Sequence, residues 1–294
     1  MATGLQSIVD VAAPAKLNLF LHVIGRRADA YHLLQSLFVL IDWCDTLHFE
    51  SRADGRLVRH DLGVSLPVDD LCLRAARLLQ QVSGTTLGAD ISIAKHVPAG
   101  AGMGGGSSDA ASTLLALNRL WGLEWPRARL LELGLKLGAD VPFFVGGHNA
   151  LVEGIGERLT PLQVPQQWLA VIKPPESIET RLIFASPLLV RDSEPVILEG
   201  FVANADQRLA HPDFGRNDLQ AAAEAECAQV VQAALALHQQ FGNSRMTGSG
   251  SAVFARAGTG AQPSAAMPAT LAPGWVGRMC RSLIEHPLVG WAAE

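Results

Sequence analysis

The fold of this chain is decided by the stretch Lys95-His96-Val97-Pro98-Ala99-Gly100-Ala101-Gly102-Met103-Gly104-Gly105-Gly106-Ser107-Ser108-Asp109-Ala110. An alternating strand pattern through Ile91 and Ile93 precedes it, and a helix is predicted from Ser108 to about Leu120. Glycines lack the Cβ atom that keeps backbone amides away from a ligand, and a helix N-terminus adds unpaired N–H groups. Alternatively, the stretch could be a glycine-rich turn in which the serines and Asp109 only cap the helix. A turn needs fewer glycines than this stretch has, which favours a ligand site. We therefore predict a phosphate site here.

Other phosphate-loop patterns fit this stretch poorly. Gly100 to Gly105 reads G-x-G-x-x-G, yet about a hundred residues precede it, whereas a dinucleotide fingerprint follows the first strand of its unit. The Walker pattern fails because Ser107 stands where a lysine is required. Neither pattern therefore identifies the phosphate site that this loop predicts.

The composition limits the class of protein. The 294 residues allow two domains, and 49% hydrophobic with 17% charged residues indicates a globular chain. A net charge of −5 without a basic run argues against nucleic acid or a membrane as partner. Four widely spaced cysteines without a signal peptide predict free thiols in a reducing cytosol. The nine histidines show none of the spacings that are typical of metal ligands, so we do not expect a metal bound by protein side chains.

The N-terminal strand pattern runs from Pro14 to Val23 and places Lys16, Asn18, Phe20 and His22 on one face. Lys16 lies among apolar neighbours, so we expect its side chain to point into a cleft rather than into solvent. Tyr31 and His32 follow a turn rich in glycine and aspartate. An aromatic beside a histidine suits stacking and hydrogen bonding to a flat base, although alone the pair is more often loop packing.

Asp140 lies in the stretch Gly138-Ala139-Asp140-Val141-Pro142-Phe143-Phe144. Apolar surroundings tend to raise the pKa of a carboxylate and make it a better base, whereas a nearby lysine opposes that shift. The alternative is that Asp140 only caps a helix or stabilises a turn. Arg245 to Ala255 forms a second glycine turn that leads into a strand. A change of composition near Pro161 predicts a domain boundary there, dividing the chain into residues 1–161 and 162–294.

The remaining elements follow from periodicity and turn residues. Asp54-Gly55 predicts a hairpin turn. We predict strands at 33–41, 46–51, 90–95, 150–154, 157–162 and 168–172, helices at 69–82, 127–137 and 217–241, and a final strand and helix after 274.

Three motifs resemble those of the GHMP kinase superfamily, the small-molecule kinases that include galactokinase, homoserine kinase and mevalonate kinase. Its loop reads P-x3-G-x-G-x-S-S, and Pro98 to Ser108 looks like the glycine-richest form of that loop. The N-terminal and C-terminal motifs of the superfamily resemble Pro14 to Leu21 and Arg245 to Ala255. The stretches Gly25 to His32 and Gly138 to Phe143 are similar to a narrower group, whose acceptor carries a cytidine diphosphate moiety. Two positions depart from that group: Ala30 replaces a glycine, and Asp109 replaces the commoner asparagine.

The resemblance implies an α+β fold with an N-terminal ribosomal-S5-like domain and a C-terminal ferredoxin-like domain. It implies an ATP-dependent kinase that uses Mg²⁺ carried with the nucleotide and acts as a monomer or weak homodimer. Lys16 and Asp140 would be the catalytic residues. The implied ATP-binding residues are Lys95, Pro98, Ala99, Gly100, Ala101, Gly102, Met103, Gly104, Gly105, Gly106, Ser107 and Ser108, and the implied substrate-binding residues are Asn18, Tyr31, His32, Thr180, Phe184 and Gly248.

Two alternatives stay open at this point. The same fold could phosphorylate another small alcohol such as homoserine or mevalonate, which needs no base-stacking aromatics. A non-enzymatic S5-like binding module is the other, although it would leave Lys16 and Asp140 without a purpose.

Overall fold

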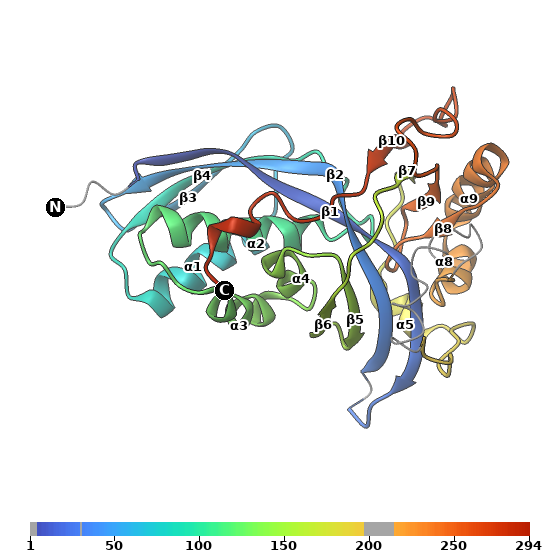
Figure 1. Cartoon of the computed structure of the whole chain (residues 1–294), viewed down its shortest axis with the longest axis horizontal. Coiled ribbons are helices and arrows are strands. Elements are labelled where there is room, and N and C mark those ends of the chain that lie inside the picture. The colour runs from blue at the N-terminus through green and yellow to red at the C-terminus, as the bar shows by residue number, and fades with distance from the viewer. Residues whose placement is uncertain (1–4, 30, 197–214) are drawn as a thin grey trace.

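The computed structural model describes residues 5–29, 31–196 and 215–294, so Ala30 lies outside the described part. Its first unit is built on two long antiparallel strands, β1 (Ser7–Arg26) and β2 (His32–Arg52). The two strands predicted at 33–41 and 46–51 are thus one continuous strand. Apolar side chains recur along both strands, and most of the residues between Val11 and Val23 are buried. The pair runs past both units of the molecule (Figure 1).

The first sheet has the order β3-β4-β2-β5-β6, with β1 paired to β2. Its further strands are β3 (Leu57–Asp61), β4 (Gly88–Ala94), β5 (Ala150–Gly154) and β6 (Arg158–Pro161). The predicted hairpin at Asp54-Gly55 is wrong, because β3 does not pair with β2 but joins β4 in parallel. The edge of β2 that a hairpin would use is occupied by β4, from Thr46 to Arg52.

Four helices cover one face of this sheet (Figure 1). They are α1 (Leu71–Ser83), α2 (Gly105–Leu120), α3 (Arg127–Leu137) and α4 (Val141–Gly146). Helix α1 begins because Asp70 accepts hydrogen bonds from the amides of Cys72 and Leu73. Helix α2 begins at Gly105, three residues before the predicted start, and is buried almost throughout because it runs through the middle of this core.

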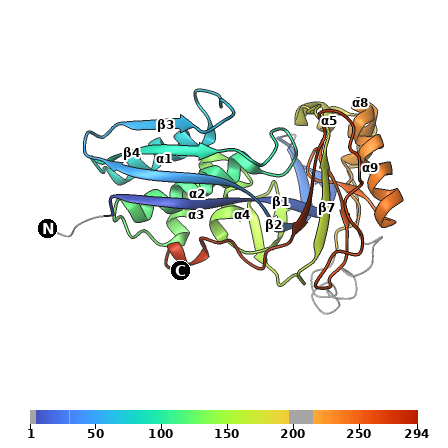
Figure 2. The same ribbon diagram turned by 90° about the horizontal axis from the view of Figure 1, so that it is seen from above.

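The second sheet has the order β10-β7-β9-β8, with every pairing antiparallel. Its strands are β7 (Trp168–Lys173), β8 (Arg245–Met246), β9 (Val253–Arg256) and β10 (Val276–Arg281). Helices α8 (Gln220–Glu226) and α9 (Ala228–Phe241) pack against it, and α5 (Thr180–Ala185) lies between the units (Figures 1 and 2). Mixed helices and antiparallel strands confirm the α+β class.

The single helix predicted over 217–241 is two helices. Cys227 has extended backbone angles, φ −142° and ψ 100°, and separates α8 from α9. The start is also later than predicted, because the side chain of Asn217 bonds the carbonyls of Met246 and Gly248 and the side chain of Asp218 accepts from the amide of Val23.

After β10 the chain returns to the first unit. The amide of Leu283 donates to the carbonyl of Leu40, and the amide of Arg127 donates to Ala293 at 2.7 Å. The helix predicted after β10 is only a 3₁₀ turn, η1 (Val289–Trp291). The boundary near residue 161 stays a prediction, although strands of the two sheets do change over between Pro161 and Trp168.

Candidate active site

A cavity of about 320 Å³, here called the central cavity, opens between the two units. Strand β1, the loop before α4, helix α5 and both glycine turns form its wall. Of the predicted site residues, those that line it are Lys16, Asn18, Gly100, Gly102, Gly104, Asp140, Thr180, Phe184 and Gly248. The structure therefore brings together residues from all three motifs.

Lys16 is buried, with 3% of its surface exposed, and its side chain points into the central cavity as predicted. Its Nζ lies 2.7 Å from Asn18 Oδ1, 3.5 Å from Asp140 Oδ2 and 4.4 Å from the centre of the Phe38 ring. Burial lowers the pKa of Lys16, and the charge and hydrogen bond of Asp140 oppose this only in part. In the described part of the chain, Asp140 is the one carboxylate that pairs with this lysine.

The predicted common face of β1 ends after Asn18. A register shift between Asn18 and Leu21 turns the strand, so that Leu21 rather than Phe20 lines the cavity. Phe20 is fully buried, and the ring of His22 lies 4.8 Å from it outside the central cavity. An alternating pattern of side chains does not reveal a β-bulge, so the predicted common face was extended beyond Asn18 to Phe20 and His22.

Asp140 occupies the N-cap position of α4, yet its side chain makes no capping hydrogen bond. The carboxylate is 32% exposed and faces Lys16 across the cavity. Phe143 and Phe144 hold the helix in the core beneath it, each at most 1% exposed. The structure thus rules out the plain capping role and leaves the carboxylate available to a hydroxyl group of a ligand.

Asn18 joins the lysine to the C-terminal motif. Its Oδ1 accepts from Lys16 Nζ, from the amide of Gly248 at 2.9 Å and from Thr247 Oγ1 at 3.1 Å. Its Nδ2 donates to Ser36 Oγ at 2.8 Å. With every polar atom engaged and 1% exposure, Asn18 holds the geometry of the site and has little capacity left to contact a ligand.

The two glycine turns pack backbone against backbone. A Cβ on Gly102, where φ is +71°, would lie 2.3 Å from the carbonyl oxygen of Thr247, and a Cβ on Gly248 would lie 2.7 Å from the carbonyl of Gly102. The amide of Ala252 donates to the carbonyl of Ala101. Only glycine fits at both places, so the turns together form one rigid corner of the cavity.

A second cavity of about 350 Å³, the loop cavity, lies on the other side of the glycine loop and shares Gly100, Gly102 and Gly104 with the central cavity. The predicted nucleotide residues that line it are Lys95, Pro98, Ala99, Gly100, Ala101, Gly102, Met103, Gly104, Gly105, Gly106 and Ser107. Ser108 is fully buried below it, and its Oγ has no hydrogen-bond partner in the described part of the chain.

Lys95 is bound by two carboxylates. Its Nζ contacts Asp45, and Asp109 at 2.5 Å, while Asp45 Oδ1 also accepts from the amides of His96 and Val97. Burial lowers the pKa of Lys95, but the two carboxylates outweigh it and the net shift is upward. Burial raises the pKa of Asp109 to about 8, against the lowering effect of Lys95. Sequence reasoning did not single out Asp45, because its partners are about fifty residues away.

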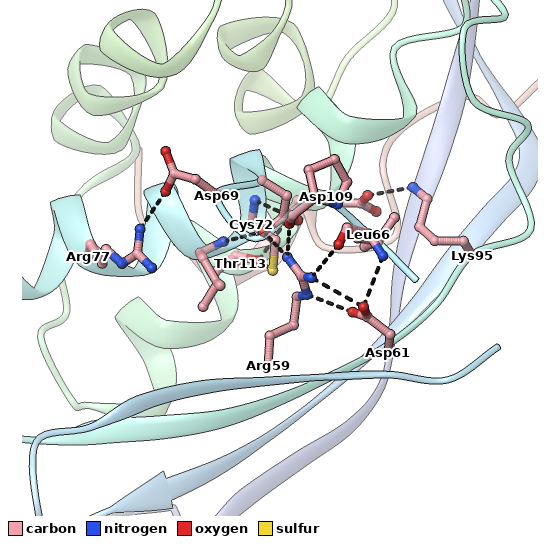
Figure 3. A network of polar contacts seen from close by, with 12 residues as sticks. Arg59, Asp61, Leu66, Asp69, Cys72, Arg77, Lys95, Asp109 and Thr113 are labelled. Atoms are coloured by element: carbon pink, nitrogen blue, oxygen red, sulfur yellow. Dashed lines mark hydrogen bonds and ion pairs between the residues drawn. The ribbon is translucent and has the colours of Figure 1, made fainter. Parts of the chain in front are cut away.

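A polar network holds the rim of the loop cavity (Figure 3). The guanidinium of Arg59 binds the carboxylates of Asp61 and Asp70 and the carbonyl of Leu66, and the amide of Leu66 donates to Asp61. This fixes the segment after β3 beside the start of α1. The sequence pattern that could have pointed to Arg59 is its i, i+2 spacing from Asp61 within a strand, which was not used above.

A third cavity of about 500 Å³, the aromatic cavity, adjoins the central cavity and shares Leu34, Ile155 and Phe184 with it. Tyr31, His32 and Phe184, all predicted to contact the substrate, line it. Tyr31 is 62% exposed, and the rings of His32 and Phe184 stack with centres 4.9 Å apart. Thr180, the first residue of α5, shares a 2.7 Å hydroxyl contact with Ser249.

Two negative findings concern the described residues alone. Among residues 5–29, 31–196 and 215–294 no three His, Cys, Asp or Glu side chains gather as a metal site. Within the same ranges no helix has the length and apolar character needed to cross a membrane.

A family model and several relatives of known name match this chain. Residues 70–148 match the GHMP kinases N terminal domain. A 4-diphosphocytidyl-2-C-methyl-D-erythritol kinase from Methylibium petroleiphilum is 66% identical over 291 residues, covering 98% of this chain and 99% of the relative.

Solved structures resemble the fold. A crystal structure of 4-(cytidine 5'-diphospho)-2C-methyl-D-erythritol kinase superimposes with a TM-score of 0.72 at 35% identity, covering 84% of this chain and 89% of that one. A homoserine kinase from Cytophaga hutchinsonii gives 0.69 at 17% identity, covering 96% of both chains, and is similar in fold alone. The predicted two-domain GHMP kinase fold is confirmed. By sequence and by fold, this chain belongs to the GHMP kinases and, within them, to the family of the 4-diphosphocytidyl-2-C-methyl-D-erythritol kinases.

Proposed function

We propose that this protein transfers the γ-phosphoryl group of ATP to the 2-hydroxyl of 4-diphosphocytidyl-2-C-methyl-D-erythritol, giving the 2-phosphate and ADP in the non-mevalonate route to isoprenoid precursors. The relatives named 4-diphosphocytidyl-2-C-methyl-D-erythritol kinase match this chain over almost its whole length. One observation supports the chemistry most directly: the Lys16–Asp140 pair lies in a cavity that adjoins a glycine-loop cavity and an aromatic cavity.

In the proposed reaction Asp140 accepts the proton of the acceptor hydroxyl. Its carboxylate is free of capping bonds and faces the central cavity. Lys16 orients the hydroxyl and stabilises the negative charge that develops on it, which a cation does most effectively where water is excluded. Asn18 keeps the ammonium group in place through its 2.7 Å hydrogen bond.

The nucleotide is assigned to the loop cavity. Backbone amides of residues 100–106, the start of α2 and the hydroxyl of Ser107 would hold the triphosphate, with the γ-phosphate toward the shared glycines. Because Lys95 already binds two carboxylates, we assign it to shaping the cavity rather than to direct phosphate binding. The family resemblance implies that Lys95 binds ATP, and the present assignment limits it to an indirect role.

The residues at the start of α2 also fit Mg²⁺ carried in with ATP. Mg²⁺ bound to phosphates needs few protein ligands and accepts oxygen donors. The Ser108 hydroxyl is such an oxygen donor, because it is buried and has no hydrogen-bond partner among the described residues, and Ser107 precedes it in the chain. When bound, the ion neutralises charge on the phosphate oxygens.

The cytidine end of the acceptor is assigned to the aromatic cavity. Tyr31 presents an exposed ring for stacking, and Phe184 lines the passage between this cavity and the central one. Thr180 and Gly248 line the central cavity, where the diphosphate and the erythritol part would lie. A small acceptor such as homoserine or mevalonate would leave the 500 Å³ aromatic cavity unused.

We place the reaction in the bacterial cytosol and expect a monomer or weak homodimer. The four cysteines are free thiols, which fits a reducing compartment.

The test is ADP release by the purified protein with ATP, Mg²⁺ and four separate acceptors: diphosphocytidyl-methylerythritol, mevalonate, homoserine and galactose. Turnover confined to the first acceptor is expected. Turnover with another would keep the roles of Lys16 and Asp140 and remove the cytidine assignment. Folded protein that is silent with all four would favour the non-enzymatic binding module.

A further inference from the structure

Arg191 connects the ring of His32 with the backbone at Phe184, and both of these residues line the aromatic cavity. Its Nε–H donates to His32 Nε2 at 3.3 Å, and its Nη2 donates to the carbonyls of Phe184 at 3.1 Å and Ser186 at 3.0 Å. Its Nη1 donates to the carbonyl of Leu189. One planar guanidinium thus fixes the imidazole on β2 relative to the end of α5.

The hydrogen bond to Arg191 determines where His32 carries its proton. A guanidinium has only donors, so the Nε2 atom that faces it must be the acceptor. A neutral imidazole with an acceptor at Nε2 carries its hydrogen on Nδ1. Burial lowers the pKa of His32, and the charges of Arg191 and Arg26 lower it further, which keeps the ring neutral near pH 7. The ring therefore carries a hydrogen-bond donor, Nδ1–H, on a residue that lines the aromatic cavity.

We propose that Arg191 is a positioning residue that locks His32 in the Nδ1–H form, so that the aromatic cavity selects a cytosine base over a uracil base. This rests on the function proposed above. Cytosine presents an acceptor at its N3 atom, whereas uracil presents an N3–H donor at the same place. A donor fixed at Nδ1 pairs with the first base and opposes the second.

The hydrogen position is tested first in the protein without ligand. A ¹H–¹⁵N NMR spectrum that correlates ring nitrogens with ring hydrogens identifies the protonated nitrogen of His32. We expect Nδ1–H in the wild type and in Arg191→Lys, which can still donate to Nε2. Arg191→Met removes the donor, and a mixture with Nε2–H is expected. A wild-type spectrum with the proton on Nε2 would overturn the proposal.

Base selection is then measured by titration with CDP and UDP, which does not depend on turnover. The wild type should bind CDP roughly 10- to 100-fold more tightly than UDP, the cost expected when one buried polar pair is mismatched. Arg191→Met should lose most of this preference, and Arg191→Lys should keep most of it. An Arg191→Met protein with the wild-type preference would refute the role of Arg191.

Arg181 provides the matched control, because it lines the same cavity but pairs with Glu179 on the surface. Arg181→Met should keep both the His32 spectrum and the ratio of CDP to UDP affinity, and a collapse of that ratio would contradict the assignment to Arg191.

Substrate kinetics give a third measurement. Arg191→Met should raise KM for the cytidine acceptor by roughly 10-fold, the effect of about one hydrogen bond, with little change in kcat. A fall in kcat at constant KM would count against a role in binding. The kinase assay and the CDP titration test the two proposals independently. A protein that prefers CDP but transfers no phosphate would refute the proposed function and leave base selection supported.

Discussion

Asp140 is the residue on which the proposed chemistry depends most. Asp140→Asn keeps the size of the side chain but removes its capacity to accept a proton, and it withdraws the charge that favours protonated Lys16. We expect kcat to fall by roughly 10²- to 10⁴-fold, the usual contribution of a general base. The nucleotide Kd should change little, because the nucleotide is assigned to the other side of the glycine loop.

Steady-state kinetics together with nucleotide titration test this prediction. Asp69→Asn, which alters an exposed carboxylate paired with Arg77, is the control and should behave as wild type. Equal kcat in Asp140→Asn and wild type would remove Asp140 from the mechanism.

Asp109 predicts a dependence of stability on pH. Its pKa is raised from 3.8 to about 8 in the folded protein, mainly by burial. The protonated form is favoured by folding, so this contribution is complete below about pH 4 and is lost as the pH rises to about 8. Denaturant unfolding across this range should show a falling free energy of unfolding. In Asp109→Asn that part of the slope should disappear, and an unchanged slope would assign it to another group.

Much of the central site could be predicted at the level of residues, because local motifs mark it. Lys16, Asp140 and the loop glycines lie in short distinctive stretches, and the structure brings them to one cavity. Asp45 and Arg191 act through partners that are distant in the sequence or lie on another element, so no local pattern marks them. Their roles depend on the tertiary fold.

The elements differ in how well periodicity defined them. Helix α3 has the predicted bounds, and α1 starts two residues later than predicted. The region 217–241 looked continuous because its alanines and glutamines favour a helix on both sides of Cys227. Likewise, the turn at Asp54-Gly55 does not say which strand β3 will join, because strand pairing depends on which edge is unoccupied.

The contact between the two glycine turns predicts the effect of Gly102→Ala. The left-handed conformation costs alanine about 1–2 kcal/mol, and the overlap with the carbonyl of Thr247 adds about 1–3 kcal/mol. We expect a large loss of stability and weaker ATP binding, measured by denaturant unfolding and nucleotide titration.

Gly122→Ala is the matched control for this change. Gly122 has a similar φ of +63°, but nothing lies within 4 Å of the added methyl group. It should show only the conformational cost of about 1–2 kcal/mol and normal ATP binding. If both variants lose the same stability, the contact between the turns carries no energetic weight.

At the scale of the whole molecule, the C-terminal residues bind a buried arginine. The guanidinium of Arg127 donates to the carbonyls of Val145, Val289 and Ala292, and to the carboxylate of Glu294. Deleting residues 287–294 leaves this charge with the carbonyl of Val145 as its one remaining hydrogen-bond acceptor among the described residues. Leaving a buried charge uncompensated costs about 3–5 kcal/mol, and each kcal/mol lowers Tm by about 2–4 °C for a protein of roughly this size.

Thermal unfolding measures this effect. Glu294→Gln changes only an exposed partner, 82% exposed, and should leave Tm almost unchanged. Arg127→Met in the shortened protein should recover part of the lost Tm, because it removes the orphaned charge. If it recovers nothing, the packing of the tail rather than Arg127 explains the loss.

The apolar residues that strands β1 and β2 share with the second sheet determine how fragments of this chain should behave. Leu17, Leu19 and Val39 from these strands share a core with Leu169 and Phe254 of the second sheet. A fragment of residues 1–161 would therefore leave an apolar surface open to water, and strands with such a surface tend to self-associate. We expect this fragment to aggregate when expressed alone and to become soluble when co-expressed with residues 162–294. The two halves would then behave as complementary fragments rather than as separable modules.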